Sequence, residues 1–279
     1  MPVDVITAPQ TGIAAARMIR RFGYRVSHAA QGEVDLLIQK NPIERGQRKL
    51  TEVLSVSRVE NKYLISQKER YLLQSYFSKV LHQDLHNGID GYLVRSLYFD
   101  TLFDDDYQQK MDGLEERHKL RLRIYGPSDR KVKLELKQKC GIYQQKQSLV
   151  LEREAAERLI GGDLSPLEAM DAPLAMQLRN MMLLEVYRPK CIVEYRRFAY
   201  IYPSNNIRIT FDSEIRASLS PYGFFSEEPC GSFVQMPGSC IMEVKYDNFM
   251  LSYIKDMLSK CSAAQTSASK YCLARELTL

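Results

Sequence analysis

The 279-residue chain lacks several features that would indicate common kinds of site. It contains no tryptophan, only four histidines, and six cysteines that never form a Cys-x-x-Cys pair. A zinc site normally needs such closely spaced ligands, so their absence argues against one. No run of about 18 or more apolar residues is present, which argues against a transmembrane helix. Scattered cysteines in a long chain without an apolar leader predict a reduced, intracellular protein.

The charge of the chain is nearly balanced. It carries 39 Lys and Arg against 34 Asp and Glu, a formal net charge of +5, and 45% of its residues are hydrophobic. That composition is typical of a globular protein with a buried core, not of a polycation. The small excess of positive charge and the lack of predicted aromatic platforms argue against nucleic-acid binding. Any anion binding must therefore come from how the charges are arranged.

The beginning of the chain differs in pattern from the rest. It combines a short basic segment with polar, unpatterned sequence, which predicts a flexible or loosely attached N-terminal extension over residues 1–55. An arginine-rich transit peptide is the alternative, but Asp4, Glu33 and Asp35 speak against it. We expect residues 56–279 to form the main domain.

From residue 57 onward, short segments alternate strictly between apolar and charged residues, which is typical of half-buried strands. In residues 118–125, Leu120 and Leu122 share a face opposite Arg121 and Arg123. The same criteria predict further strands at residues 59–65, 94–99, 132–139, 193–202, 207–212 and 241–246.

Turns and helices separate these strands. Residues 126–129 and 203–206 contain Gly, Pro, Ser, Asp and Asn, which predict hairpin loops. Apolar residues spaced three and four apart predict helices at residues 67–82, 149–160, 173–187 and 252–261. Antiparallel strands joined by hairpins, with helices between them, indicate the α+β class.

The charges on the polar strand faces allow two interpretations. For a single strand, a solvated outer face is the usual one. Here at least five segments carry mixed Arg, Lys and Glu at alternate positions. We therefore expect a closed antiparallel β-barrel tunnel of about eight strands, with charged residues inside and helices packed outside. A basic interior of that kind focuses its field on an anion more strongly than an open surface does.

The types of residue on these faces suit phosphate. Arg offers paired donors to phosphate oxygens, and Lys offers a mobile point charge. Arg121 and Arg123 on one strand, with Lys133 and Lys137 on the next, would project several donors toward one line. That arrangement suits a chain of phosphates better than a single carboxylate ligand.

Three carboxylates share the basic faces. Glu60, Glu135 and Glu243 could neutralise part of the positive lining, or they could hold a divalent cation that bridges phosphate oxygens. Ligation by oxygen alone, without Cys or His, favours Mg²⁺ or Mn²⁺.

Six motifs, in the order in which they occur, resemble the VTC domain over about residues 57–275. That domain is the catalytic domain of the vacuolar transporter chaperone polyphosphate polymerases and belongs to the triphosphate tunnel metalloenzyme (CYTH-like) superfamily. The resemblance implies a closed β-barrel tunnel and transfer of the ATP γ-phosphate onto a growing polyphosphate chain. The motifs are Glu60-Asn61-Lys62-Tyr63, Leu120 to Gly126, Leu134-Glu135-Leu136-Lys137, Tyr195-Arg196-Arg197, Ile207 to Asp212 and Met242-Glu243-Val244-Lys245.

The resemblance also implies roles for single residues. The cations that would grip nucleotide and polymer phosphates during catalysis are Lys62, Arg121, Arg123, Lys137, Arg197, Arg208 and Lys270. The residues expected to contact substrate around them are Lys133, Lys146, Tyr195, Lys245 and Ser269. Glu243 would hold the Mn²⁺ or Mg²⁺ ion, with Glu60 as a second candidate ligand.

Two departures from the family pattern bear on the activity. The superfamily begins with Glu-x-Glu-x-Lys, whereas this chain has Arg58, Glu60 and Lys62 at those places. One carboxylate fewer favours the polymerase over the hydrolytic branch. In addition, Ser267 stands where a lysine is expected, which weakens the predicted phosphate site there.

Two alternatives to the polymerase stay open at this point. The same fold could hydrolyse tripolyphosphate or nucleoside triphosphates, or it could bind polyphosphate without catalysis. The expected partners are ATP and polyphosphate, with no nucleic acid and no membrane span in this chain. We expect a cytoplasmic location, with a separate membrane partner as the route to the inner face of a membrane.

Overall fold

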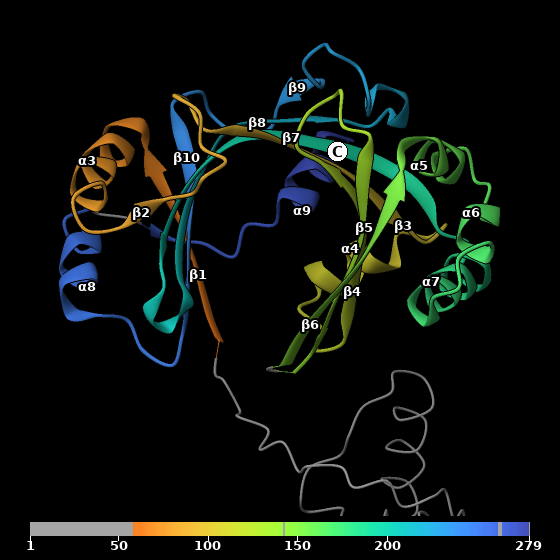
Figure 1. The fold of residues 1–279 in the computed structure, drawn as a ribbon, viewed down its shortest axis with the longest axis horizontal. Helices are drawn as coiled ribbons and strands as arrows, with labels where there is room; N and C mark the ends of the chain where they lie inside the picture. Colours follow the sequence, from red (N-terminus) through yellow and green to blue (C-terminus); the bar gives the residue numbers. More distant parts are fainter. Residues whose placement is uncertain (1–57, 142, 262–263, 279) are drawn as a thin grey trace, which may run out of the picture. The chain divides into compact units, whose positions relative to one another are not determined.

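The computed structural model describes residues 58–141, 143–261 and 264–278 (Figure 1). The predicted extension over residues 1–55 lies outside the described residues, so the predicted domain division stays a prediction. In the described part, no helix is both long and apolar enough to cross a membrane.

The described chain is built around one antiparallel sheet of eleven strands. Along the sheet the order is β11-β1-β10-β8-β7-β3-β4-β5-β6, with β2 paired to β7 and β9 paired to β8. The strands are β1 (Arg58–Ser66), β2 (His82–Gln83), β3 (Tyr92–Asp100), β4 (Arg117–Ile124), β5 (Lys131–Cys140), β6 (Tyr143–Glu152), β7 (Arg188–Tyr202), β8 (Ile207–Ser218), β9 (Ser232–Phe233), β10 (Ser239–Asp247) and β11 (Ala264–Gln265).

Figure 1 shows the sheet curving into an arch with a convex outer and a concave inner side. Helices α3 and α8 lie outside one limb, α5, α6 and α7 lie outside the other, and α9 lies on the concave side. The helices are α3 (Gln67–Phe77), α4 (Asp105–Met111), α5 (Arg153–Ile160), α6 (Ser165–Glu168), α7 (Pro173–Leu184), α8 (Ser252–Leu258) and α9 (Lys270–Arg275), with short 3₁₀ turns at η2 (Ser204–Asn206), η3 (Pro221–Gly223) and η4 (Glu276–Thr278).

The apolar strand faces are buried under the outer helices, as the alternation predicts. On one limb Leu120 and Leu122 are fully buried in a core shared with α5, α6 and α7. On the other limb Phe211 lies in a second core with Leu73 and Phe77 of α3. The charged faces of the same strands are thereby directed to the concave side.

Helix α9 covers the centre of the concave face. Its Tyr271 is 1% exposed and stacks on Tyr98 of β3 with ring centroids 5.0 Å apart. The preceding Ser269 caps the helix, because its side chain accepts a hydrogen bond from the Cys272 amide. Packing of α9 carries Lys270, from the far end of the chain, onto the charged face.

The predicted closed barrel of about eight strands is wrong. The sheet is open: β6 pairs with β5 alone, β1 pairs with β10 and β11, and within the described residues nothing joins β6 to β1. The placement of all helices outside is also wrong, since α9 packs on the concave side. The described fold is mostly sheet. Alternation fixes the two faces of each strand, but an open curved sheet and a closed barrel have the same alternation.

One helix prediction is also partly wrong, and the other three run past the observed ends of their helices, since α3 ends at Phe77, α7 at Leu184 and α8 at Leu258. Residues 149–160 were expected to be helical, but β6 runs to Glu152 and α5 begins only at Arg153. The apolar residues Leu149 and Leu151 satisfy either period over so short a span, and the continuing pairing with β5 selects the strand. The predicted strands and the two hairpin loops are confirmed.

Candidate functional site

Glu135 on β5 holds one group of cations on the concave face. Its carboxylate accepts a hydrogen bond from Nε of Arg121 at 2.8 Å, lies 3.7 Å from Nη1 of Arg123 and pairs with Lys146. Burial alone would raise the pKa of Glu135, but the charges of Arg121 and Arg123 outweigh it and lower the pKa to about 2. The ionised carboxylate therefore fixes three cations from β4 and β6.

Asp212 on β8 holds a second group. The carboxylate accepts two hydrogen bonds from Arg197, at 2.7 and 2.8 Å, and lies 2.7 Å from Nζ of Lys270. Asp212 is fully buried, and the two cations lower its pKa despite that burial. Tyr195 lies beneath both, with its ring centroid 5.2 Å from the Arg197 guanidinium and 4.8 Å from Lys270. The predicted residues Tyr195 and Arg197 of β7 and Lys270 of α9 thus meet at a carboxylate of β8, Asp212, that was not predicted as a site residue.

Two further carboxylates organise the lysines near β1 and β10. Glu60 lies 3.4 Å from Lys62, 3.5 Å from Lys137 and 3.3 Å from Lys245. Glu243 lies 2.7 Å from the same Lys245 amine. Lys137 belongs to β5 and Glu60 to β1, so side chains link the two limbs of the arch where strand pairing does not.

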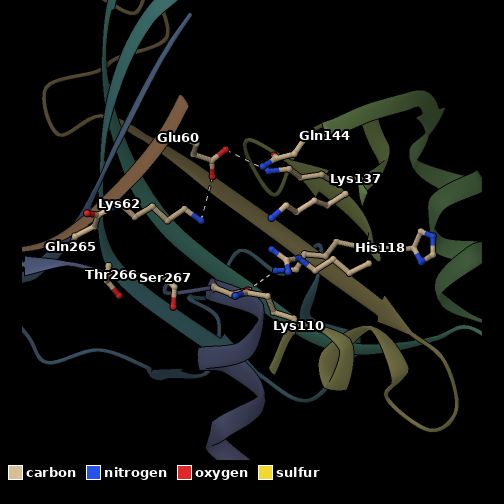
Figure 2. A pocket seen from close by; sticks show the side chains of 13 residues that line it. Glu60, Lys62, Lys110, His118, Lys137, Gln144, Gln265, Thr266 and Ser267 are labelled. Carbon is tan, nitrogen blue, oxygen red and sulfur yellow. Dashed lines mark hydrogen bonds and ion pairs between the residues drawn. The ribbon is translucent and has the colours of Figure 1, made fainter. Parts of the chain in front are cut away.

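Between these limbs lies a pocket of about 320 Å³ (Figure 2). Lys62, Lys110 and Lys137 point into it, whereas the ring of His118 points away. Six basic residues line it against one acidic residue, Glu60. The basic residues are Lys62, Lys110, Arg117, Lys119, Lys137 and Lys139. A pocket with this lining suits a ligand that carries several negative charges.

Three lysines of the lining, Lys110, Lys119 and Lys139, were missed as site residues, and so was Arg117. Lys119 donates a hydrogen bond to Oγ of Ser269 at 2.6 Å, and burial, with Lys62 and Lys110 nearby, lowers its pKa to about 7. The alternation of β4 already places Lys119 on the face of Arg121, so the sequence carried the signal. Lys110 lies on α4, and only tertiary packing brings it to the pocket.

The predicted residues do not all line this pocket. Lys62, Lys137, Ser269 and Glu60 do, and most of the others surround Glu135, Asp212 and Glu243 on the same concave face. Two lie apart from these carboxylates. Arg208 is held by Asp84, at 2.8 Å, and by the Tyr92 hydroxyl.

Lys133 is the second predicted residue that lies apart from Glu135, Asp212 and Glu243. It is exposed, and its amine lies 5.2 Å from the centroid of the Tyr125 ring at the hairpin end of β5. Its strand partner is Arg123, so it continues the row of cations outward. A long anion that followed the concave face would reach Lys133 only at its end.

The donor set fits a hard divalent cation shared with a ligand. Glu60 and Glu243 both contact the Lys245 amine, at 3.3 and 2.7 Å, so their carboxylates lie near each other. In the described residues, no group of three or more His, Cys, Asp or Glu side chains could hold a metal ion. Mg²⁺ and similar ions are commonly held by one or two carboxylates together with substrate phosphates. Glu243 and Glu60 meet that requirement.

Comparisons with solved structures find low similarity to several proteins. A proposed adenylate cyclase from Bacillus halodurans is 16% identical, with a TM-score of 0.42 over 76% of this chain and 95% of that chain. The PH1819 protein from Pyrococcus horikoshii is 12% identical, with a TM-score of 0.42 over 79% and 99%. The Mediator head module of Schizosaccharomyces pombe gives 10% identity and a TM-score of 0.42 over 75% and 99%. These scores are too low to support any argument about activity.

Sequence comparisons give a clearer result. No curated protein matches the chain. The model of the VTC domain family matches residues 57–279, which covers all the strands described above. Over these residues the chain belongs to the VTC domain family.

Proposed function

We propose that the protein is an ATP-dependent polyphosphate polymerase that transfers the γ-phosphate of ATP to the end of a polyphosphate chain. The observation that carries this proposal is the concave face itself. Cations from β4, β6, β7, β10 and α9 are held in place there by the buried carboxylates of Glu135, Asp212 and Glu243. Membership of the VTC domain family supports the same substrates, ATP and polyphosphate.

The chemistry asks mainly for positioning and charge neutralisation. A terminal phosphate oxygen of the polymer attacks the γ-phosphorus of ATP, the bond from that phosphorus to the bridging oxygen breaks, and ADP leaves. The attacking oxygen is already anionic, so no side chain has to remove a proton from it. Arg121, Arg123 and Lys137 bind the phosphates of the nucleotide in this scheme, while Arg197 and Lys270 bind the polymer end.

The carboxylates have separate tasks in this proposal. Glu135 and Asp212 keep their arginines oriented before any substrate arrives, which lowers the cost of ordering them in the transition state. Glu243, with Glu60, would hold a Mn²⁺ or Mg²⁺ ion. When bound, that ion would withdraw negative charge from the phosphate oxygens.

The direct test incubates the purified full chain with ATP and Mn²⁺ and separates the products on a gel. Long polymer together with ADP is the expected result. Orthophosphate without polymer would identify a hydrolase on the same fold. Binding of polyphosphate without turnover of ATP would identify a non-catalytic binder. Either of these two results would overturn the polymerase proposal.

A substitution then tests the proposed phosphate ligands. Arg121→Gln should lower the rate of polymer synthesis by about 10²- to 10³-fold, since it removes a donor aimed at developing charge. Arg130→Gln, an exposed arginine in the loop before β5, is the matched control and should keep the full rate. Circular dichroism checks that both variants fold. A folded Arg121→Gln protein with normal synthesis would contradict the assigned role.

The location follows from the proposed substrates. ATP is a cytoplasmic nucleotide, and we propose that the domain works there, with a separate membrane partner if the polymer is exported. Fractionation of cells that express the full chain tests this. Recovery of the protein outside the cytoplasmic fraction, with no accompanying membrane protein, would contradict it.

A further inference from the structure

Arg70 on α3 is a buried arginine without a counter-ion. The residue is 8% exposed, and its side chain forms no ion pair within the described residues. Nη1 donates one hydrogen bond to Oγ of Ser213 at 3.0 Å, while the buried Nε has no hydrogen-bond partner in the described structure. A buried charge is costly unless it is paired, so this arrangement calls for an anion.

The arginine faces an open space. A cavity of about 410 Å³ lies between α3, the loop at residues 89–90 and strands β7 and β8, and Arg70 is part of its lining. It adjoins a second cavity of about 250 Å³ that shares Gln67, Ser213 and Glu214. The larger volume falls within the range of about 300–1,000 Å³ that is usual for small-molecule sites.

The charged groups of the lining are two arginines, Arg70 and Arg196, and two carboxylates, Asp90 and Glu214. Arg196 on β7 also borders the cavity, and its side chain is 48% exposed and only 3.6 Å from Glu214. Asp90, the remaining carboxylate of the lining, makes no ion pair with Arg70. Two guanidinium groups therefore border one cavity in which a single loose ion pair is formed.

This cavity lies on the other side of the sheet from the proposed polymerase site. Ser213 and Asp212 are neighbours on β8, so their side chains point to opposite faces. Arg196 and Arg197 on β7 are related in the same way. A ligand beside Arg70 could not touch the cations held by Asp212.

We propose that the cavity lined by Arg70 and Arg196 is a second anion site on the convex face, and that it binds inorganic phosphate or a small phosphate monoester. A phosphate dianion offers several acceptor oxygens and enough charge for two guanidinium groups, whereas a carboxylate compensates only one. The buried Nε of Arg70 would gain the acceptor that it lacks.

The absence of tryptophan from the chain allows a selective measurement. Tyr71 lines the cavity, is 61% exposed, and has its ring centroid 5.8 Å from the Arg70 guanidinium. Tyr71→Trp therefore places the sole tryptophan of the full chain beside the proposed site. Its fluorescence is titrated with sodium phosphate, with sodium chloride added to keep the ionic strength constant.

We expect a saturable change in this fluorescence. Adding Arg70→Met should abolish it, and adding Arg196→Gln should weaken the apparent affinity by about tenfold, as expected for a lost charge-assisted contact. Adding Arg121→Gln should leave the titration curve unchanged, because the tryptophan lies on the convex face and its fluorescence does not respond to phosphate bound on the concave face. Acetate at the same ionic strength serves as the carboxylate probe and should give no saturation.

Three results would overturn the proposal. They are a titration that does not saturate, an identical curve in the Arg70→Met background, and saturation by acetate at lower concentration than by phosphate. If Arg70→Met does not fold, Arg196→Gln with the Tyr71→Trp reporter still tests the proposal. An unchanged affinity for phosphate in that variant would contradict a site between the two arginines. The titration uses no ATP, so failure of the polymerase proposal would leave this test intact.

Discussion

Asp212→Asn is the most informative single substitution in this protein. It keeps the shape of the side chain but removes the charge that holds Arg197, at 2.7 and 2.8 Å, and Lys270, at 2.7 Å. Both cations are largely buried, with side chains 15% and 12% exposed. The variant therefore leaves two poorly solvated positive charges without their shared partner.

The size of the effect follows from that burial. Removing one partner of a buried ion pair typically costs about 3–5 kcal/mol. Because Arg197 and Lys270 keep some contact with water, we expect the lower end, about 3 kcal/mol. In a domain of this size that loss corresponds to a fall in melting temperature of about 6–12 °C.

Denaturation by urea, followed by circular dichroism at several pH values, measures the loss. The pKa of Asp212 is lowered from its ordinary value of 3.8, so its contribution is complete above that pH and disappears as the pH falls below it. The difference between the two proteins should therefore be constant near neutrality and shrink below about pH 4. Tripolyphosphate should stabilise the variant more than the parent, because it supplies the missing negative charge.

Asp171→Asn is the matched control, since Asp171 is exposed and far from the concave face. It should change the free energy of unfolding by less than about 0.5 kcal/mol. A loss below about 1 kcal/mol in Asp212→Asn would refute the reasoning, because the carboxylate would then not be compensating buried charge. A loss that persists undiminished at pH 3 would refute it as well.

Other groups lead to three further predictions. Burial raises the pKa of Asp106 to about 8, so the free energy of unfolding should fall as the pH rises from about 4 to 8. The slope should reach about 1.4 kcal/mol per pH unit in urea denaturation, and Asp106→Asn should remove it. The pKa of Lys119 is about 7, so calorimetry should show that the affinity for tripolyphosphate declines as the pH rises through 7. Lys119→Gln should bind tripolyphosphate more weakly at pH 6, and its affinity should not decline between pH 6 and 8. Chelation of divalent cations should stop polymer synthesis, and Glu243→Gln should raise the Mn²⁺ concentration needed to restore it; unchanged Mn²⁺ dependence would exclude Glu243 as a ligand.

The sequence determined which side chains share a face. Leu120 and Leu122 are buried outward while Arg121 and Arg123 lie on the concave side, because successive residues of a strand point to opposite faces whatever the rest of the chain does. The same local rule would have included Lys119 in the site. Hairpin loops between the strands were predictable for a similar reason, since turn residues act over a few positions.

Only the tertiary structure decided what those faces enclose. Strand alternation carries no information about pairing between β1 and β6, and the sheet stays open. The docking of α9 brought Lys270 to Asp212 from nearly sixty positions away along the chain, and α4 brought Lys110 to the pocket. These outcomes depend on packing between distant segments, which no local period specifies.

The carboxylates show the same division. The sequence left Glu60, Glu135 and Glu243 open between neutralising the positive lining and holding a metal ion. In the structure Glu135 is 1% exposed among Arg121, Arg123 and Lys146, which gives it the neutralising task. Glu60 and Glu243 share one lysine, and we propose that they hold the cation. Residue type supplied the chemistry of each group, and burial with its particular neighbours assigned its task, because the strength of a charge interaction depends on the surroundings that folding creates.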